Sequence, residues 1–409
     1  MKLALNLHRI RSFGPSKALV RTFRVLAFET SADDTGVAIV DDTKVLSNVI
    51  LKQHADHEEF RGIHPQVALQ MHDKNLPTAL RQALKEASFN VQDIDGIAFT
   101  RGPGMPGCLA VGANAARTLA AALDKPLVGV HHMQAHALTA LYTSQPPPSY
   151  PFLTLLVSGG HTLLLLAHSR TSFEIMATTR DDSIGNAFDR VATLLNVPWS
   201  RERSAGASLE AFALGAPELS APFPIPMSGK LAFSYSGLIS SVRAYILTRS
   251  DPEMTIDPPQ TFADPFLKHP PTPERAAMQE RIRRTVEIMS LQERKSIAAA
   301  FQRAAVGQLE AKLRLGLKEC LRKNVHPGSI VVSGGVASNS YLRARLRCVV
   351  ESDTEAGIRL VFPPPALCTD NAVMIAWASL ERFQGQDYDE LSANIRPTWS
   401  IEDICVRDG

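Results

Sequence analysis

The sequence of 409 residues contains few cysteines, and none of them lies close to another. The five are Cys108, Cys320, Cys348, Cys368 and Cys405, without a C-x-x-C pair. An odd and scattered set is typical of a reducing compartment and does not build a disulfide framework. A zinc site made of cysteines is therefore disfavoured.

Long apolar runs and a strong net charge are missing as well. No stretch approaches the roughly 20 apolar residues that a membrane span needs, so we expect a soluble chain without membrane contact. Lysine and arginine together number 43, aspartate and glutamate 41, which gives a formal net charge of +2. This balance argues against a protein that coats a polyanion, but it leaves room for a local basic surface.

The first 23 residues lack acidic side chains altogether. Their basic residues are Lys2, Arg9, Arg11, Lys17 and Arg21, interspersed with apolar ones. This composition is typical of a mitochondrial transit peptide, and a disordered basic tail is the alternative. We therefore predict a transit peptide over residues 1–23 and a location in the mitochondrial matrix.

Two well-separated stretches look alike, which indicates an internal repeat. "RVLAFETSADDTGVAIV" (24–40) and "FLTLLVSGGHTLLLLA" (152–167) each have the pattern strand, small polar turn, strand. Further patterns follow over residues 95–100 (strand), 107–123 (helix), 126–130 (strand), 275–323 (helix), 329–335 (strand) and 371–383 (helix). The alternation predicts an α/β fold with largely parallel sheets covered by helices, and the repeat predicts two lobes with a cleft between them.

One segment interrupts this pattern. Residues 249–274 are polar and rich in proline, which predicts a mobile insertion. The segment that follows, residues 274–301, has helical period and a basic face. That face could contact nucleic acid, although a solvated helix surface is the commoner explanation.

Three histidines stand where a strand runs into a helix, in "VGVHHMQAHALTA" (128–140). His132 and His136 are four residues apart, so on a helix their side chains share a face and can converge on one ion. The spacing alone is a weak signal. It lacks the glutamate of the metalloprotease H-E-x-x-H motif, and a third ligand, usually a carboxylate, is still needed.

Two Ser-Gly-Gly turns are more informative. "SGGHT" (158–162) and "SGGVASN" (333–339) each follow a predicted strand. Glycines there let backbone N–H groups approach phosphate oxygens, and a helix N-terminus adds a favourable field for anions. Two such turns, beside "ETSADDTG" (29–36) in the first hairpin, predict a ligand that carries phosphate.

The loop "TRGPGMPG" (100–107) contains G-x-G-x-x-G between a strand and a helix. In a dinucleotide fold the next strand would end in an acidic ribose ligand. Here it ends in His131 and His132, and Pro103 and Pro106 fit the loop poorly. We interpret the motif as a chance match.

Several carboxylates stand near these motifs. Asp33 and Asp34 lie in the first hairpin turn, where they could meet a substrate, a metal or water. Asp189 lies on a predicted helix, where a carboxylate facing a cleft commonly binds ribose hydroxyls. Asp370 precedes the last predicted helix, so it is either a site residue or a helix cap.

These motifs together resemble one known family. They are the segments ETSADDTG, GPGMPG, HHMQAH, VSGGHT, AFDRVA, FSYSGL, SGGVASN and CTDNA, in this order over residues 24–395. Each is weak alone, but the ordered series is highly specific. The chain resembles the tRNA N6-threonylcarbamoyladenosine synthases of the TsaD type.

The resemblance implies a two-lobed actin-like, sugar-kinase (ASKHA) fold, in which duplicated ribonuclease-H-like subdomains enclose a central cleft. It implies an N-terminal lobe over residues 24–133, completed by about 370–409, and a C-terminal lobe over residues 134–369. The doubled hairpins agree with this arrangement.

The resemblance also implies roles for individual residues. It implies His132, His136 and Asp370 as metal ligands, Asp33 and Asp34 as the acidic pair associated with catalysis, and Val157, Ser158, Gly159, Gly160, His161, Asp189, Gly206, Ser333, Gly334, Gly335 and Asn339 as the residues that bind the nucleotide substrate. Among these, Asp189 would contact ribose, Asn339 would lie near the base, and Ser158 would be a further neighbour of the metal.

The sequence departs from the family pattern in several places. The usual Gly-Gly-Pro loop has only Gly206, and Asn186 replaces the usual glutamate. Ala32 replaces a usual cysteine, and residues 62–65 differ from the common Gly-Gly-Val-Val-Pro. Leu156 stands where some relatives have a metal-binding tyrosine. None of these changes removes the three metal ligands.

The implied reaction is transfer of a threonylcarbamoyl group from threonylcarbamoyl-AMP to the exocyclic amine of the adenosine beside the anticodon of mitochondrial tRNAs. One divalent metal ion per subunit is implied, and two histidines with a carboxylate accept zinc, iron, magnesium or manganese. The implied partners are tRNA, threonylcarbamoyl-AMP with AMP as product and ATP as an analogue, an upstream YrdC-type synthase of threonylcarbamoyl-AMP, and a second copy of the chain in a homodimer.

Three other functions compete with this one. An ATP-dependent kinase or ATPase of the same fold would not need two histidines and an aspartate at its phosphate. A metallopeptidase would need the missing H-E-x-x-H glutamate. A tRNA-binding module without activity would not explain an acidic pair beside a phosphate site.

Overall fold

The structure is a computed structural model. It describes residues 22–42, 44–57, 63–198, 203–219, 223–250, 273–353 and 357–405. The predicted transit peptide lies outside the described residues except for its last two positions. Most of the predicted insertion, residues 251–272, lies outside them as well. Both therefore stay predictions.

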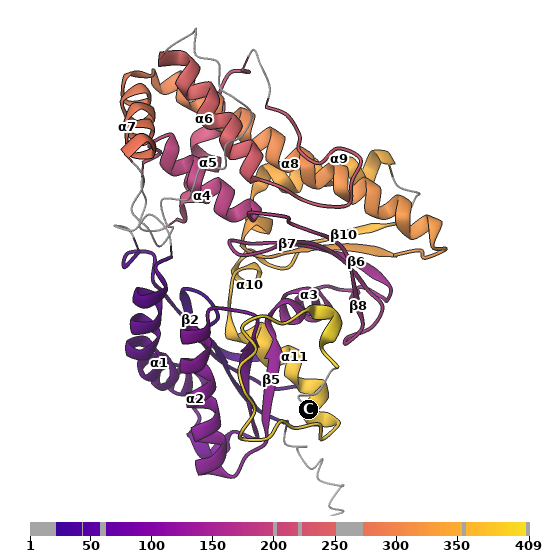
Figure 1. Ribbon diagram of the computed structural model, residues 1–409. Helices are drawn as coiled ribbons and strands as arrows, with labels where there is room; N and C mark the ends of the chain where they lie inside the picture. The colour runs from indigo at the N-terminus through magenta and orange to yellow at the C-terminus, as the bar shows by residue number, and fades with distance from the viewer. Residues whose placement is uncertain are drawn as a thin grey trace, which may run out of the picture.

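Two five-stranded sheets form the framework of the molecule (Figure 1). The first contains β1 (Val25–Glu29), β2 (Asp34–Val40), β3 (Val45–Lys52), β4 (Gly96–Gly102) and β5 (Leu127–His131). The second contains β6 (Phe152–Val157), β7 (Thr162–Ala167), β8 (Phe173–Thr178), β9 (Ser329–Ser333) and β10 (Arg359–Val361).

The two sheets have the same topology. In the first the order is β3-β2-β1-β4-β5, and in the second, read from the other edge, it is β8-β7-β6-β9-β10. In each sheet the first three strands are antiparallel neighbours, and the last two continue the sheet in parallel. The duplicated, two-lobed α/β fold is confirmed. The expectation of largely parallel sheets is wrong, because β3 and β8 extend each hairpin with a third antiparallel strand.

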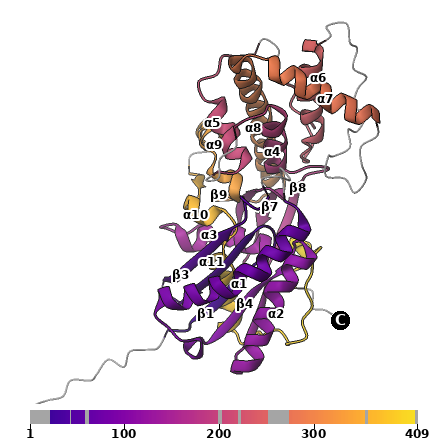
Figure 2. The same cartoon turned by 90° about the vertical axis from the view of Figure 1, so that its left-hand side faces the viewer.

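Helices cover the outer face of each sheet. On the first sheet these are α1 (Pro65–Ala87) and α2 (Pro106–Leu123), with the short η1 (Val91–Asp93) between them (Figure 2). On the second sheet, α8 (Leu291–Arg322) and α9 (Ser340–Asp353) contact the strands. The helices α4 (Ile184–Leu194), α5 (Ala205–Ala213), α6 (Ser236–Ser250) and α7 (Pro273–Ile288) pack against α8 and one another and extend this lobe away from the sheet (Figure 1). The helix predicted over 275–323 is two helices, because Ser290 caps a new one by accepting from the Glu293 amide.

A shared core joins the inner faces of the two sheets. Side chains alternate along β1, so Leu26 and Phe28 face α1 and α2, whereas Val25 and Ala27 face inward. The inward residues pack with α3 (His132–Thr143) and α11 (Ala372–Gln384) in one cluster, which also includes Leu165 of the second sheet. The two helices therefore lie between the sheets (Figure 1).

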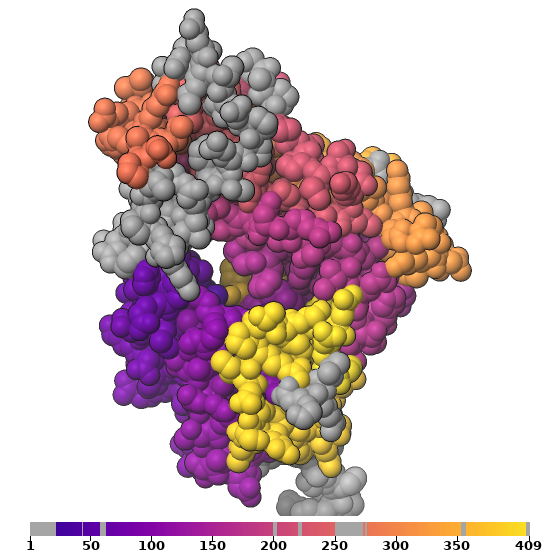
Figure 3. All heavy atoms as spheres, in the orientation of Figure 1, coloured from indigo at the N-terminus to yellow at the C-terminus, as the bar shows by residue number. Residues whose placement is uncertain are grey.

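The remaining short elements are η2 (Gly335–Ser338), α10 (Pro365–Cys368) and η3 (Ile401–Asp403). In the space-filling view, a hollow separates the indigo residues of the first lobe from the magenta residues of the second (Figure 3).

No helix among the described residues is both long and apolar enough to cross a bilayer. We propose that the lobe boundaries follow the expected division, with the segment from about residue 370 returning to the first lobe.

The segment after α11 ties the two lobes together. The Asp389 amide donates to the Leu127 carbonyl at 2.8 Å, and the Arg396 amide donates to the Arg101 carbonyl at 2.7 Å, both in the first lobe. Further along, the Glu402 carboxylate accepts from the Ile175 amide of β8, in the second lobe. The sequence patterns did not predict this connection.

Asp389 is expected to anchor that segment. Its carboxylate accepts from the Gly129 amide at 2.7 Å and from Arg382 Nη1 at 2.9 Å, and Arg101 Nη1 lies 3.4 Å away. Asp389→Asn removes the charge of a carboxylate that contacts two partly buried arginines, so the free energy of unfolding should fall by about 2–4 kcal/mol in urea titration.

The control is Asp387→Asn, which removes a carboxylate that also pairs with Arg382 but is 44% exposed. Exposed pairs contribute little, so this change should cost less than about 1 kcal/mol. Equal losses for the two variants would contradict the anchoring role of Asp389.

Candidate metal centre

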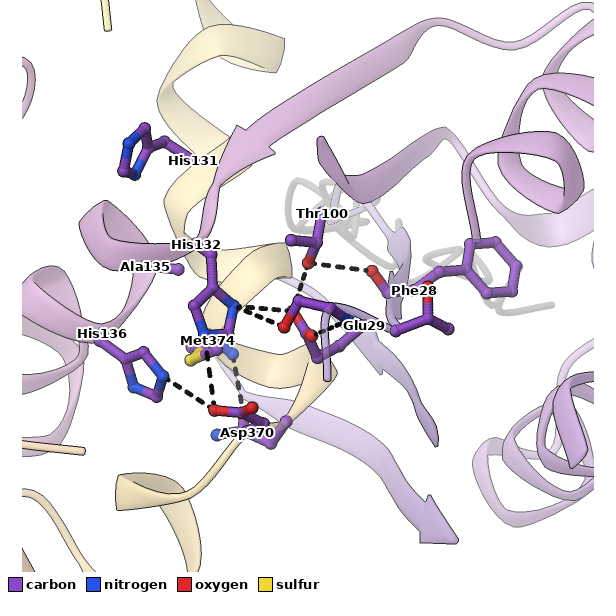
Figure 4. A network of polar contacts seen from close by, with 12 residues as sticks. Phe28, Glu29, Thr100, His131, His132, Ala135, His136, Asp370 and Met374 are labelled. Carbon is purple, nitrogen blue, oxygen red and sulfur yellow. Dashed lines mark hydrogen bonds and ion pairs between the residues drawn. The ribbon is translucent and has the colours of Figure 1, made fainter. Parts of the chain in front are cut away.

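The three histidines of the β5–α3 junction divide into two groups. His131 caps α3 by accepting from the Gln134 amide, and its Nε2 donates to the Trp399 carbonyl at 3.2 Å. Burial lowers its pKa to about 3, so it is neutral. It points away from the other two (Figure 4), and we assign it a structural role.

His132 and His136 lie on one face of α3, and Asp370 joins them from the segment between α10 and α11 (Figure 4). Asp370 Oδ1 lies 3.5 Å from His132 Nε2 and 3.0 Å from His136 Nε2. The three donor atoms all lie within 4.8 Å of one another, and no other such group of histidine, cysteine or acidic side chains occurs among the described residues. The structure thus brings the three predicted ligands together.

Asp370 is not a helix cap. The residue that caps α11 is Asn371, whose side-chain oxygen accepts from the Met374 amide at 3.0 Å. Burial alone would raise the pKa of Asp370, but His132 and His136 lower it well below its usual range. The carboxylate is therefore ionised and acts as an acceptor only.

Sequence reasoning missed a second carboxylate at this site. Glu29, the last residue of β1, is completely buried, and its Oε2 lies 3.1 Å from His132 Nδ1. Burial would lower the pKa of His132, yet Glu29 and Asp370 outweigh it and raise this pKa to about 10. The available signal was an acidic residue at the end of an otherwise apolar strand.

The residues present fit a divalent cation. Two imidazole nitrogens and one carboxylate oxygen are a ligand set that zinc, iron and manganese accept. The buried carboxylate of Glu29 and the half-buried carboxylate of Asp370 also make the surroundings of the histidines negative, which favours a positive ion. The predicted metal site is thus chemically reasonable.

The two Ser-Gly-Gly turns lie side by side. Strands β6 and β9 are parallel neighbours with Leu156 opposite Ser333, so both turns extend from the same end of the second sheet. Ligands commonly bind in the crevice beyond the carboxyl ends of parallel strands. The two predicted phosphate-binding turns therefore face one site.

The glycines of the two turns differ in how tightly the surrounding chain packs against them. Gly334 has a φ of +97°, and a Cβ there would lie 2.3 Å from the Val157 carbonyl oxygen. Gly159 and Gly160 are exposed, with nothing within 4 Å of an added Cβ. The first turn thus leaves its backbone accessible to a ligand. Gly335 begins η2, so a 3-10 turn follows β9 directly.

The first turn also lies near the histidine cluster. His161 has its pKa lowered to about 4 by burial and by the charge of His132, with Asp370 opposing. Ser158 closes the turn by accepting from the His161 amide with its Oγ at 3.1 Å. The structure gives Ser158 this local role, and its expected place beside the metal stays a proposal.

The acidic pair lies at the start of β2. Asp34 is 9% exposed, and its Oδ1 is buried without a hydrogen-bond partner among the described residues. Burial and the carboxylates of Asp33 and Asp370 raise the pKa of Asp34 well above its usual range. Asp33 is more exposed, at 21% of its side chain, and lies 3.8 Å from His54 Nδ1. Burial raises its pKa as well, with His54 opposing.

Two further predicted residues are in direct contact. The Gly206 amide donates to Asp189 Oδ1 at 2.6 Å, and burial raises the pKa of Asp189 to about 7. Asn339 has its side chain committed within the protein. Its oxygen accepts from the Leu342 amide, and its nitrogen donates to Gln302 Oε1. The amide nitrogen keeps a second hydrogen and the oxygen a second lone pair, so both bonds can persist if Asn339 contacts a base.

The G-x-G-x-x-G loop is packed against protein. A Cβ at Gly102 would lie 1.8 Å from the Arg396 carbonyl oxygen, and one at Gly104 would lie 2.8 Å from the Ser31 carbonyl oxygen. Close packing of the chain accounts for these glycines, in agreement with a chance match.

Comparison with known proteins identifies relatives over nearly the whole chain. Residues 44–377 match the family described as TsaD, tRNA N6-adenosine threonylcarbamoyltransferase. A protein of Arabidopsis thaliana described as "Probable tRNA N6-adenosine threonylcarbamoyltransferase, mitochondrial" is 38% identical over 389 residues, which cover 92% of this chain and 74% of that one.

Bacterial proteins described as tRNA N6-adenosine threonylcarbamoyltransferase match at nearly full length. That of Rickettsia conorii is 35% identical, covering 93% of this chain and 99% of its own. That of Rhizobium etli is 36% identical, covering 94% and 96%.

Gly185 offers a test of the first turn. A Cβ at this position of α4 would lie 2.5 Å from the Ser158 carbonyl oxygen and 2.8 Å from Gly159. Gly185→Ala should displace the turn and weaken AMP binding about tenfold in calorimetric titration, since overpacking typically costs about 1–3 kcal/mol. Gly237→Ala, which meets nothing within 4 Å, should bind AMP as the unaltered protein does. Unchanged binding by Gly185→Ala would show that the turn does not hold the nucleotide.

Proposed function

This chain belongs to the TsaD family and is an enzyme of the tRNA N6-adenosine threonylcarbamoyltransferase class, and on that premise we propose that its acyl donor is threonylcarbamoyl-AMP. The proposal has one main support. Two Ser-Gly-Gly turns extend side by side from β6 and β9, next to a cluster of two histidines and an aspartate. A mixed anhydride with phosphate in its leaving group needs such surroundings.

The turns would bind the phosphate of the donor. Backbone amides near Gly159 and Gly160 are accessible and uncharged, so they can donate to phosphate oxygens without proton transfer. As AMP leaves, negative charge grows on its phosphate, and fixed donors stabilise that charge without reorganising. Asp189 would bind the ribose, and the Gly206 amide, which donates to its Oδ1, would hold that carboxylate in place.

His132, His136 and Asp370 would hold a divalent metal ion. When bound, such an ion supplies Lewis-acid stabilisation of negative charge on the donor. The protein contributes the orientation of the three ligands, which come from α3 and from the segment before α11. Because these elements pack between the two sheets, the site is held by both lobes.

The adenosine amine attacks the carbonyl carbon of the threonylcarbamoyl group, and the bond from that carbon to the phosphate oxygen breaks. The amine loses one proton, and AMP leaves with the electron pair of the broken bond. We assign Asp33 as the acceptor of that proton, because Asp34 is more buried and its pKa is raised further. An aromatic amine is a poor nucleophile, so orientation in the cleft matters as much as the base.

The proposed location of the chain rests on its N-terminal composition and on one relative. We propose that the chain acts in the mitochondrial matrix on tRNAs with an adenosine beside the anticodon, because the Arabidopsis relative is described as mitochondrial. If a fluorescent fusion lacking residues 1–23 still reached the mitochondria, the transit peptide would be contradicted.

Two partners are also proposed. A YrdC-type synthase would supply the donor. Light scattering tests the proposed homodimer, and a monomer under assay conditions would reject it.

The family match and the named relatives favour the transferase over the kinase, peptidase and passive tRNA-binding alternatives. The family match and the nearly full-length relatives all carry the transferase description.

The decisive assay combines the purified chain, threonylcarbamoyl-AMP, an anticodon-loop tRNA and a divalent metal. Threonylcarbamoyladenosine should form, as detected by mass spectrometry of the nucleosides. Asp370→Asn or prior chelation should lower the rate at least about 100-fold, because ligand loss removes the metal. Asp403→Asn, at an exposed carboxylate of η3, should have no effect. Absence of product with every divalent metal would reject the proposed reaction.

If Asp33 is the base, asparagine substitutions of Asp33 and Asp34 should lower kcat by different factors. Asp33→Asn removes the base and should lower kcat by about 100-fold or more. Asp34→Asn replaces a carboxyl whose raised pKa favours its neutral form, so the loss should stay below about tenfold.

The pH profile follows from the same assignment. The pKa of Asp33 is raised above its usual 3.8, and the base must be ionised, so activity should fall as the pH falls through that raised pKa. Equal effects of the two substitutions, or a profile that Asp33→Asn leaves unchanged, would reject Asp33 as the base.

A further inference from the structure

Glu29 is fully buried, and both of its carboxylate oxygens have polar partners. Its Oε1 accepts from the Ser31 amide at 2.7 Å, and its Oε2 accepts from the Thr100 hydroxyl and faces His132 Nδ1 at 3.1 Å. A buried carboxylate costs several kcal/mol unless it is paired and hydrogen-bonded. These contacts hold the carboxylate in one orientation, directed at the imidazole (Figure 4).

This contact fixes which nitrogen of His132 carries a proton. An ionised carboxylate only accepts hydrogen bonds, so His132 Nδ1 must be the donor. In the neutral ring, the lone pair then belongs to Nε2, the atom 3.5 Å from Asp370 Oδ1. Glu29 therefore selects the tautomer whose free nitrogen faces the predicted cation.

The second histidine has no such support. His136 Nε2 lies 3.0 Å from Asp370, but its Nδ1 is buried without a hydrogen-bond partner in the described part of the chain. The two histidines therefore differ in their surroundings. Of the two, only His132 has a charged group beside its Nδ1 among the described residues.

We propose that Glu29 is a positioning residue that holds His132 as the Nδ1–H tautomer and makes its Nε2 a stronger ligand for a divalent cation. The inference deepens the proposed function and rests on its metal site. Outer carboxylates of this kind orient metal-ligating histidines and typically change metal affinity by about 10–100-fold.

The isosteric variant Glu29→Gln makes a specific prediction. The Ser31 amide is a fixed donor, so the glutamine carbonyl oxygen must take the place of Oε1. The amide nitrogen then takes the place of Oε2 and donates toward His132 Nδ1. His132 Nδ1 then accepts this hydrogen bond. The neutral imidazole therefore carries its proton on Nε2, the atom that would bind the metal.

The experiment is a titration with Co²⁺, whose visible absorption reports nitrogen and oxygen coordination, in competition with a chelator of known affinity. Glu29→Gln should bind Co²⁺ about 10–100-fold more weakly than the unaltered chain. Glu310→Gln, at a carboxylate of α8 that is 5% exposed and paired with Arg345, controls for the general effect of neutralising a buried acid and should bind normally.

A second readout separates positioning from a structural role. In the Zn²⁺-loaded chain, nitrogen-15 NMR should show a proton on His132 Nδ1 hydrogen-bonded to a carboxylate, and Glu29→Gln should lose this signal. The unfolding midpoint of each chelated variant is measured beside it. If Glu29→Gln does not fold, Glu29→Asp keeps the charge but shortens the reach, and it should lower Co²⁺ affinity by severalfold.

The outcomes are distinct. An unaltered chain that binds Co²⁺ and a folded Glu29→Gln or Glu29→Asp that binds it equally well would overturn the positioning role alone. An unaltered chain that shows no Co²⁺ coordination would overturn both this role and the proposed metal site.

Discussion

The structure depends on the approach of one carboxylate to two imidazoles at the junction of the lobes. Asp370 and the pair His132 and His136 are far apart in the sequence, yet Oδ1 lies 3.0 Å from one ring and 3.5 Å from the other. The elements that carry them, α3 and α11, pack in the core shared by both sheets. Any change in how the lobes meet would therefore change the spacing of the three donor atoms.

The rest of the cleft follows from the duplicated topology. In each lobe the first and fourth strands are parallel neighbours, so their carboxyl ends lie together. In the second lobe this places both Ser-Gly-Gly turns at one edge. In the first lobe it places Glu29 beside Thr100, at the base of the histidine cluster. The proposed substrate and cation sites thus lie at corresponding ends of two similar sheets.

Much of this arrangement could be predicted from the sequence, because hairpins, glycine turns and histidine spacing are local patterns. The motif order added Asp370, which spacing alone left as either a ligand or a cap. Glu29 was missed, since its role arises from a contact with His132 across 103 positions of the chain. The third strand of each sheet and the tie through Asp389 were missed for the same reason, because they depend on pairing between distant segments.

The most direct test of the account is a structure of the chain loaded with a divalent metal, with the ion located by anomalous scattering. The account predicts one ion, with His132 Nε2, His136 Nε2 and an Asp370 oxygen as its protein ligands at about 2.0–2.2 Å for zinc. An ion bound elsewhere, or coordinated without Asp370, would contradict it.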